Sequence, residues 1–324
     1  HGPLMIAGFF GTVISLERAV ALRHPLAYLA PAFTGIGTFA FLAGAPDLVA
    51  GSLILAGSAV FLAASLAVLG IQMAAHTILL AVGALALVAG NVLWLAGTPI
   101  ENLLPGWIAF LVLTIVGERL ELSRMRPTGQ KARWAFITLI AVFGTGALLE
   151  SASISQANLI FGSALIGLAG WLILFDIARV TVRQSGLVRY IAVCLLSGYV
   201  WLMIAGFMWA FPDLFPLDAY MRDAALHSIF LGFVFAMVFG HAPIILPAVT
   251  TFAVPYHWMF YVHLAALELS LFLRVYSDIA GYDELRSHAS LCNALTLLLF
   301  VLNTVLAVRR GLNHRTAFRP LPLN

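Results

Sequence analysis

The sequence predicts an all-α, polytopic membrane protein built as a bundle of transmembrane helices. Hydrophobic residues make up 62% of the 324 positions and charged residues 10%, whereas soluble domains are about half apolar and a quarter charged. Apolar runs of roughly 20 residues, the length that crosses about 30 Å of hydrocarbon as a helix, recur from end to end. No segment between them is long enough to fold as a soluble domain, so we expect residues 1–324 to form a single integral membrane domain.

Eleven apolar runs are long enough to cross a bilayer. Their cores are 2–22, 27–45, 48–70, 72–96, 105–122, 134–150, 157–180, 188–211, 219–247, 255–275 and 288–309. The chain opens on a helix without an initiator Met, which predicts a further helix upstream and therefore twelve spans. The alternative is that His1 is a mature N-terminus whose amino group and imidazole could chelate copper.

Charged residues alternate between the two sides of these helices. Basic residues fill one set of loops, namely Arg23, Arg124, Arg126, Lys131, Arg133, Arg183, Arg189, Arg309, Arg310, Arg315 and Arg319. Acidic residues fill the other set, namely Asp47, Glu101, Glu150, Asp213, Asp218, Asp223, Asp278, Asp283 and Glu284, joined only by Arg222 and Arg286. Because Lys and Arg stay on the cytoplasmic side, we expect a bacterial inner-membrane protein with a cytoplasmic C-terminus. The basic residues form no patch interleaved with aromatic residues, so we expect no nucleic-acid partner.

Histidines inside the apolar runs fall at two depths. His1 and His227 lie near the outer face, and His76, His241 and His263 lie in the inner half. Two imidazoles from different helices at one depth can hold a haem iron between them. Small residues beside them, Gly2, Gly8, Gly11, Ala224, Ala225 and Ser228, would admit a flat macrocycle, but they equally suit helix packing. The alternative is that each histidine hydrogen-bonds to a neighbouring helix or reaches the interface.

Three helices, each four apart in order, share a pattern near their inner ends. The first contains Glu17-Arg18, the fifth Gly117-Glu118-Arg119 and the ninth Gly240-His241. A four-helix unit repeated three times would give twelve spans with pseudo-threefold symmetry. We interpret Glu17 and Glu118 as carboxylates neutralised by Arg18 and Arg119, or the arginines as ligands of haem propionates or lipid phosphates.

The stretches "HGPLM" and "LHSIFLGFVFAMVFGHAPIILP", eight helices apart, resemble the membrane subunit of the haem-copper oxidase superfamily, and more closely its divergent NnrS-type relatives. The resemblance implies a low-spin b-type haem with His1 and His227 as axial ligands. The fifth and sixth helices contain no histidine, and Ala225 stands at the position of the high-spin haem ligand. The usual oxygen-reducing haem-copper centre is therefore not expected.

The remaining intramembrane polar residues suggest further sites. His76, His241 and His263 could hold copper or a second haem. Glu268 has no basic neighbour in sequence and is either a step in a proton route or a neutral hydrogen-bond donor. Asn91, Asn293 and Asn303 are predicted to form hydrogen bonds between helices.

Two functions from different classes fit these residues. The first is a haem protein of electron transfer or nitrogen-oxide metabolism in a respiratory chain, with a periplasmic cytochrome c or cupredoxin and other membrane subunits as partners. Such a protein could be the electron-transfer subunit of an oxidoreductase complex. The second is a proton- or metal-coupled transporter or a structural membrane subunit. The sequence contains no nucleotide motif and no Ser/His/Asp arrangement, so any chemistry would come from a cofactor.

Overall fold

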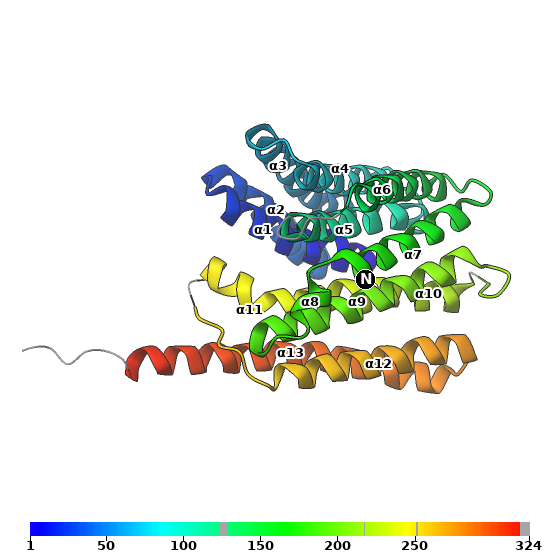
Figure 1. Ribbon diagram of the computed structural model, residues 1–324. Coiled ribbons are helices and arrows are strands. Elements are labelled where there is room, and N and C mark those ends of the chain that lie inside the picture. The colour runs from blue at the N-terminus through cyan, green and yellow to red at the C-terminus, as the bar shows by residue number, and fades with distance from the viewer. Residues whose placement is uncertain (124–128, 217, 251, 318–324) are drawn as a thin grey trace, which may run out of the picture. The chain divides into compact units, whose positions relative to one another are not determined.

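The computed structural model describes residues 1–123, 129–216, 218–250 and 252–317, and these residues contain helices and no strand (Figure 1). Ten helical segments among them are long and apolar enough to cross a membrane. The all-α polytopic fold is thus confirmed, and the protein is a multi-pass membrane protein. The charges assigned to Arg124, Arg126 and Arg319 lie outside the described residues.

The tenth predicted run differs from the observed helix. It was expected at 255–275, but helix α12 spans Phe260–Ala280, five residues later. Pro255 disfavours helical backbone in the residue before it, and residues 252–257 form no helix. Helix α12 is 21 residues long, enough to span, but Glu268, Arg274 and Asp278 leave it less apolar than the ten other segments.

The described chain divides into two compact units. The first comprises His1–Gly129 and Ile140–Phe161, and the second comprises Gln130–Leu139 and Gly162–Asn324, of which residues up to 317 are described. Both α6 and α7 contribute to each unit, so the boundary falls within helices and not in a linker. The prediction of a single integral membrane domain stays a prediction.

The first unit contains the first five candidate spans, which are built from seven helical elements. It also contains the part of α6 from Ile140 onward. A π-helix, η1 (Leu4–Phe10), leads into α1 (Gly11–Leu22), and a short 3-10 helix, η2 (Pro25–Tyr28), leads into α2 (Leu29–Leu42). Then follow α3 (Asp47–Ile71), α4 (Ala75–Leu95), α5 (Ile100–Ser123) and α6 (Gln130–Ser151). Helix α3 packs between α2 and α4, and α4 packs on α5.

A hydrogen-bond chain ties three helices of the first unit together. The Trp107 indole donates to Asn91 Oδ1 at 3.1 Å, and Asn91 Nδ2 donates to Ser58 Oγ at 3.2 Å. All three side chains are buried, Trp107 and Asn91 completely. Because buried polar groups without partners are costly, this chain fixes the relative rotation of α3, α4 and α5. It also confirms the interhelical role predicted for Asn91.

The second unit continues from α7 (Ala157–Phe175) through α8 (Ala178–Thr181) to α9 (Gly186–Ala210). The next span consists of α10 (Ala219–His227), a second π-helix η3 (Ser228–Phe235) and α11 (Ala236–Thr250). Helix α12 then pairs with α13 (Asp283–Ala317) as an antiparallel hairpin (Figure 1). Helix α12 also contacts α9, α10 and η3.

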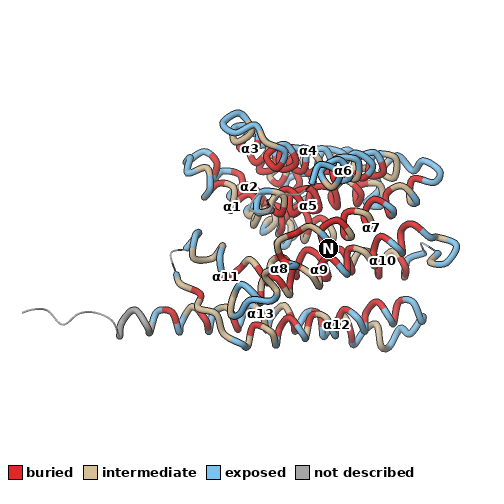
Figure 2. Tube along the Cα trace, viewed as in Figure 1, coloured by how far each residue is buried: buried red, intermediate tan, exposed pale blue. Residues whose placement is uncertain are grey.

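Exposed residues occur along the helices of both units (Figure 2), and many of them have large apolar side chains. Phe39 is 73% exposed in α2 and Leu298 is 54% exposed in α13. Continuous apolar surface of this kind is rare on soluble proteins. A lipid bilayer accounts for it, because hydrocarbon solvates these side chains as well as a protein core does.

Candidate functional site

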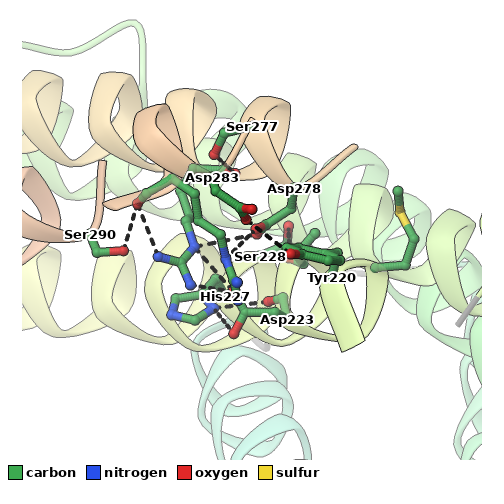
Figure 3. Close-up of polar contacts among 12 residues, drawn as sticks. Tyr220, Asp223, His227, Ser228, Ser277, Asp278, Asp283 and Ser290 are labelled. Carbon is green, nitrogen blue, oxygen red and sulfur yellow. Dashed lines mark hydrogen bonds and ion pairs between the residues drawn. The ribbon is translucent and has the colours of Figure 1, made fainter. Parts of the chain in front are cut away.

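Four charged side chains form a network at one end of the second unit (Figure 3). Arg274 donates from Nε to Asp223 Oδ2 at 3.1 Å and also contacts Asp223 through Nη2. Arg274 Nε lies 3.3 Å from Asp278 Oδ2, and Arg286 Nε lies 2.9 Å from Asp278 Oδ1. Arg286 Nη2 lies 3.5 Å from Asp223 Oδ2, which closes the network. Two arginines and two aspartates balance, so the network carries no formal net charge. We call it the outer charge network, because the sequence predicts that its acidic residues lie on the outer side.

The surrounding helices place these four residues. Asp218 caps the start of α10 by accepting from the Met221 amide at 2.9 Å, which sets Asp223 one and a half turns into that helix. Helix α12 ends at Gly281 in the left-handed conformation, φ 69°. Such a C-cap suits glycine because it has no Cβ. The chain then reverses into α13 and brings Arg286 back beside Asp278.

Tyr220 and Asp283 extend the outer charge network towards its exposed side. The Tyr220 hydroxyl donates to Asp283 Oδ1 at 2.9 Å, and the Arg286 guanidinium carbon lies 4.7 Å from the centre of the Tyr220 ring. This cation–π contact and hydrogen bond join α10 to the start of α13. An open surface hollow of about 450 Å³ lies at the same turn, lined by Tyr282, Asp283, Glu284 and His288 among others.

His227 borders the outer charge network at the end of α10. Its Nδ1 donates to the Asp223 backbone carbonyl at 2.9 Å and lies 3.4 Å from Asp223 Oδ1. Since a carbonyl only accepts, Nδ1 carries a proton, and in the neutral imidazole Nε2 then carries the lone pair. A metal-binding histidine is typically held in this way, by a carbonyl or carboxylate at its other ring nitrogen. The side chain is 21% exposed.

Other histidines show that the carbonyl contact alone is not distinctive. His241 Nδ1 donates to Met237 O at 2.7 Å, and His288 Nδ1 donates to Glu284 O at 2.8 Å, each four residues back along its helix. His227 differs from them because its Nδ1 also lies near the Asp223 carboxylate. That carboxylate is held in place by an ion pair with Arg274.

Both predicted haem ligands stand at the start of a π-helical segment. Helix η1 begins three residues after His1, and η3 begins directly after His227. These are the two π-helices in the described part of the chain. π-Helical segments occur frequently at functional sites. His1 is exposed and belongs to the first unit, whereas His227 belongs to the second.

The small residues near these histidines mostly serve helix packing. Ala224, Ala225 and Ser228 are completely buried within the span of His227. A Cβ on Gly8 would meet the Thr38 side chain at 2.6 Å, whereas one on Gly2 would meet nothing within 4 Å. The packing alternative therefore accounts for the residues beside His227 and for Gly8.

The three inner histidines lie in different surroundings. His76 is buried at the start of α4 in the first unit, with Nε2 3.7 Å from Glu121 Oε1. His241 lies on α11 and His263 on α12, both in the second unit. Within the described ranges, no group of three or more His, Cys, Asp or Glu side chains is arranged to hold a metal ion. Copper or a second haem at these histidines stays a prediction.

His263 uses both ring nitrogens in hydrogen bonds. Nε2 lies 2.9 Å from the Tyr190 hydroxyl, and Nδ1 lies 3.1 Å from Asn303 Nδ2. Asn303 therefore joins α13 to α12, which confirms its predicted interhelical role. For Asn293 the structure differs, because its Oδ1 is buried without a hydrogen-bond partner. Metal binding at His263 would require one of the two hydrogen bonds to break.

The structure brings together the two Glu-Arg pairs that sequence comparison aligned. Glu17 interacts electrostatically with Arg18 and Arg119, and Glu118 interacts with Glu17 and both arginines. These four residues come from α1 and α5 of the first unit, and Arg119 is 4% exposed. Two carboxylates and two guanidiniums again balance, as in the outer charge network.

Sequence reasoning did not anticipate the outer charge network. The charge pattern of the sequence assigns the acidic side chains and Arg286 to outer loops, and it gives Arg274, inside the predicted run 255–275, no role. The available signal was the four-residue spacing of Arg274 and Asp278, which puts both on one helical face. Because α12 ends at Ala280, five residues later than predicted, both Arg274 and Asp278 lie within the helix. Both side chains are buried.

The apolar helices and their internally paired charges define a multi-pass, α-helical membrane protein. The chain belongs to the family DUF8744, described as a domain of unknown function, whose model matches residues 1–309. No curated protein matches the chain, and no solved structure does. The resemblance to haem-copper oxidases and NnrS-type proteins stays a prediction.

Proposed function

We propose that this protein binds a low-spin b-type haem through His227 and serves in electron transfer or nitrogen-oxide metabolism in a bacterial inner membrane. The observation that carries the proposal is the contact of His227 Nδ1 with the carbonyl and carboxylate of Asp223. A metal-binding histidine is typically held at its other ring nitrogen by such a carbonyl or carboxylate contact. When bound, the haem would supply one-electron transfer.

His1 is the second axial ligand that the sequence resemblance implies. The proposed membrane orientation puts the C-terminus in the cytoplasm. The acidic residues Asp283 and Glu284 would then face outside, where they suit a periplasmic cytochrome c or cupredoxin with a basic face. Association with other membrane subunits, as part of an oxidoreductase complex, follows from the same proposal.

Replacing His227 tests the proposal directly. We expect purified protein to show a reduced-minus-oxidised spectrum with a sharp b-type α-band, and His227→Ala to lose that band and the bound haem. His288→Ala is the matched control, because His288 makes the same carbonyl contact on α13 but is exposed. Folded wild-type protein that contains no haem, or a His227→Ala variant that keeps a normal spectrum, would refute the assignment.

A proton-coupled transporter is the second candidate function. It is favoured by Glu268, which lies inside α12 with one oxygen buried and unpartnered. An intramembrane carboxylate without a countercharge suggests a functional role. Haem content separates the two candidates, since a transporter needs none.

A further inference from the structure

Glu268 stands without a countercharge among the described residues of the second unit. It is the ninth residue of the 21-residue helix α12, and its Oε2 accepts a hydrogen bond from the Trp201 indole of α9 at 2.6 Å. Its Oε1 is buried and has no hydrogen-bond partner. No Arg, Lys or His in the described ranges forms an ion pair with it, although ion pairs occur elsewhere in the second unit.

This geometry fits a carboxyl group that takes up a proton. One neutral N–H donor compensates only part of the cost of a buried carboxylate. A proton on Oε1 removes the charge while Oε2 keeps the Trp201 hydrogen bond. The indole can only donate, so it serves the ionised and the protonated group alike.

The groups that face Glu268 include one titratable neighbour. Cys194 of α9 is completely buried and interacts electrostatically with Glu268. Helix η3, which also contacts α12, contains no titratable residue. The charged residues contributed by α10 and α13 pair instead with Arg274 and Asp278, further along α12.

We propose that Glu268 is a proton-binding site within the second unit, positioned by the Trp201 indole at Oε2. A proton that binds at Oε1, the buried oxygen without a partner, converts the carboxylate into a carboxylic acid. The site shares no residue with the proposed haem ligands.

Infrared difference spectroscopy of the full-length protein at two pH values tests the site without a haem or a substrate. We expect a pH-dependent carboxylic C=O band that is lost in Glu268→Gln and retained in Glu284→Gln, the exposed control at the start of α13. Trp201→Phe should shift the band to higher frequency, because the carbonyl loses its donor. A spectrum that is the same in wild type and Glu268→Gln, with no shift in Trp201→Phe, would overturn the proposal.

Discussion

Asp278 illustrates how single residues in this membrane protein depend on their partners. Its side chain is completely buried, and its two oxygens contact Arg274 and Arg286 as ion pairs without aligned hydrogen bonds. A buried ion pair adds little net stability when both partners are present, because desolvation offsets the attraction. Removing one partner is costly, because it leaves an uncompensated charge. Among the described residues, Glu268 forms no ion pair with a cation, and its one hydrogen-bond partner is the neutral Trp201 indole.

The first residue-scale prediction concerns Arg274. We expect Arg274→Met to lower the free energy of unfolding in detergent by about 3–5 kcal/mol, because Asp278 loses one of its two cations and Asp223 its shortest contact. Arg309→Met, at an exposed position of α13, should change it by less than about 0.5 kcal/mol. Equal effects of the two variants would contradict the role of the network.

A double variant separates unpaired charge from lost packing. We expect Arg274→Met combined with Asp278→Leu to be less destabilised than the sum of the two single variants, since an apolar pair replaces a buried ion pair. The measurement is a double-mutant cycle of unfolding free energies. Strict additivity would show that Arg274 and Asp278 do not stabilise each other.

At the scale of the element, glycine decides where helices approach most closely. A Cβ on Gly206 of α9 would meet Ile166 N at 2.8 Å and Gly162 O at 2.9 Å. A Cβ on Gly162 of α7 would meet the Gly206 carbonyl at 2.6 Å, so each glycine leaves room for the other helix. Small residues play this part in membrane helices because they allow backbones to pack directly.

The close contact between α7 and α9 at Gly162 and Gly206 leads to a prediction about stability. Gly206→Ala should destabilise the protein by about 1–3 kcal/mol, because the backbone of α7 cannot move aside as a side chain would. Gly170→Ala is the matched control in α7, since its Cβ would meet only Met203 Cε at 3.8 Å. That variant should be neutral or gain up to about 1 kcal/mol from helix propensity. Thermal unfolding in one detergent compares the stability of the two variants. If Gly206→Ala were as stable as Gly170→Ala, the close contact between α7 and α9 would be contradicted.

At the scale of the whole molecule, helix α12 decides the number of spans. It is less apolar than the ten other segments but pairs with α13 along its length. Its charged residues Arg274 and Asp278 are buried against α10 and α13 instead of facing lipid. Ionisable residues within membrane segments are tolerated in this way, facing inward and paired. We therefore predict that α12 is a further crossing, in addition to the ten segments found among the described residues.

Labelling with a membrane-impermeant maleimide in intact cells tests this crossing. In a Cys292→Ala background, Tyr282→Cys should be labelled from outside, and Trp258→Cys should be labelled only after permeabilisation. Both positions are exposed, Tyr282 by 56% and Trp258 by 64%, and the remaining Cys194 is completely buried. Labelling of both positions from the same side would mean that α12 does not cross.

Sequence alone determined the helical membrane fold, the order of the spans and most of their limits. The reason is that the thickness of the bilayer sets the length and apolar composition of a spanning helix, and both are local properties of the sequence. It also selected Glu268, Asn91 and Asn303 as residues needing polar partners. The partners themselves were decided only by the tertiary structure, because Trp201, Trp107 and His263 lie on other helices whose rotation no local pattern encodes. The outer charge network shows this most clearly, since its members lie on three helices and meet only when α10 and the α12–α13 hairpin pack together.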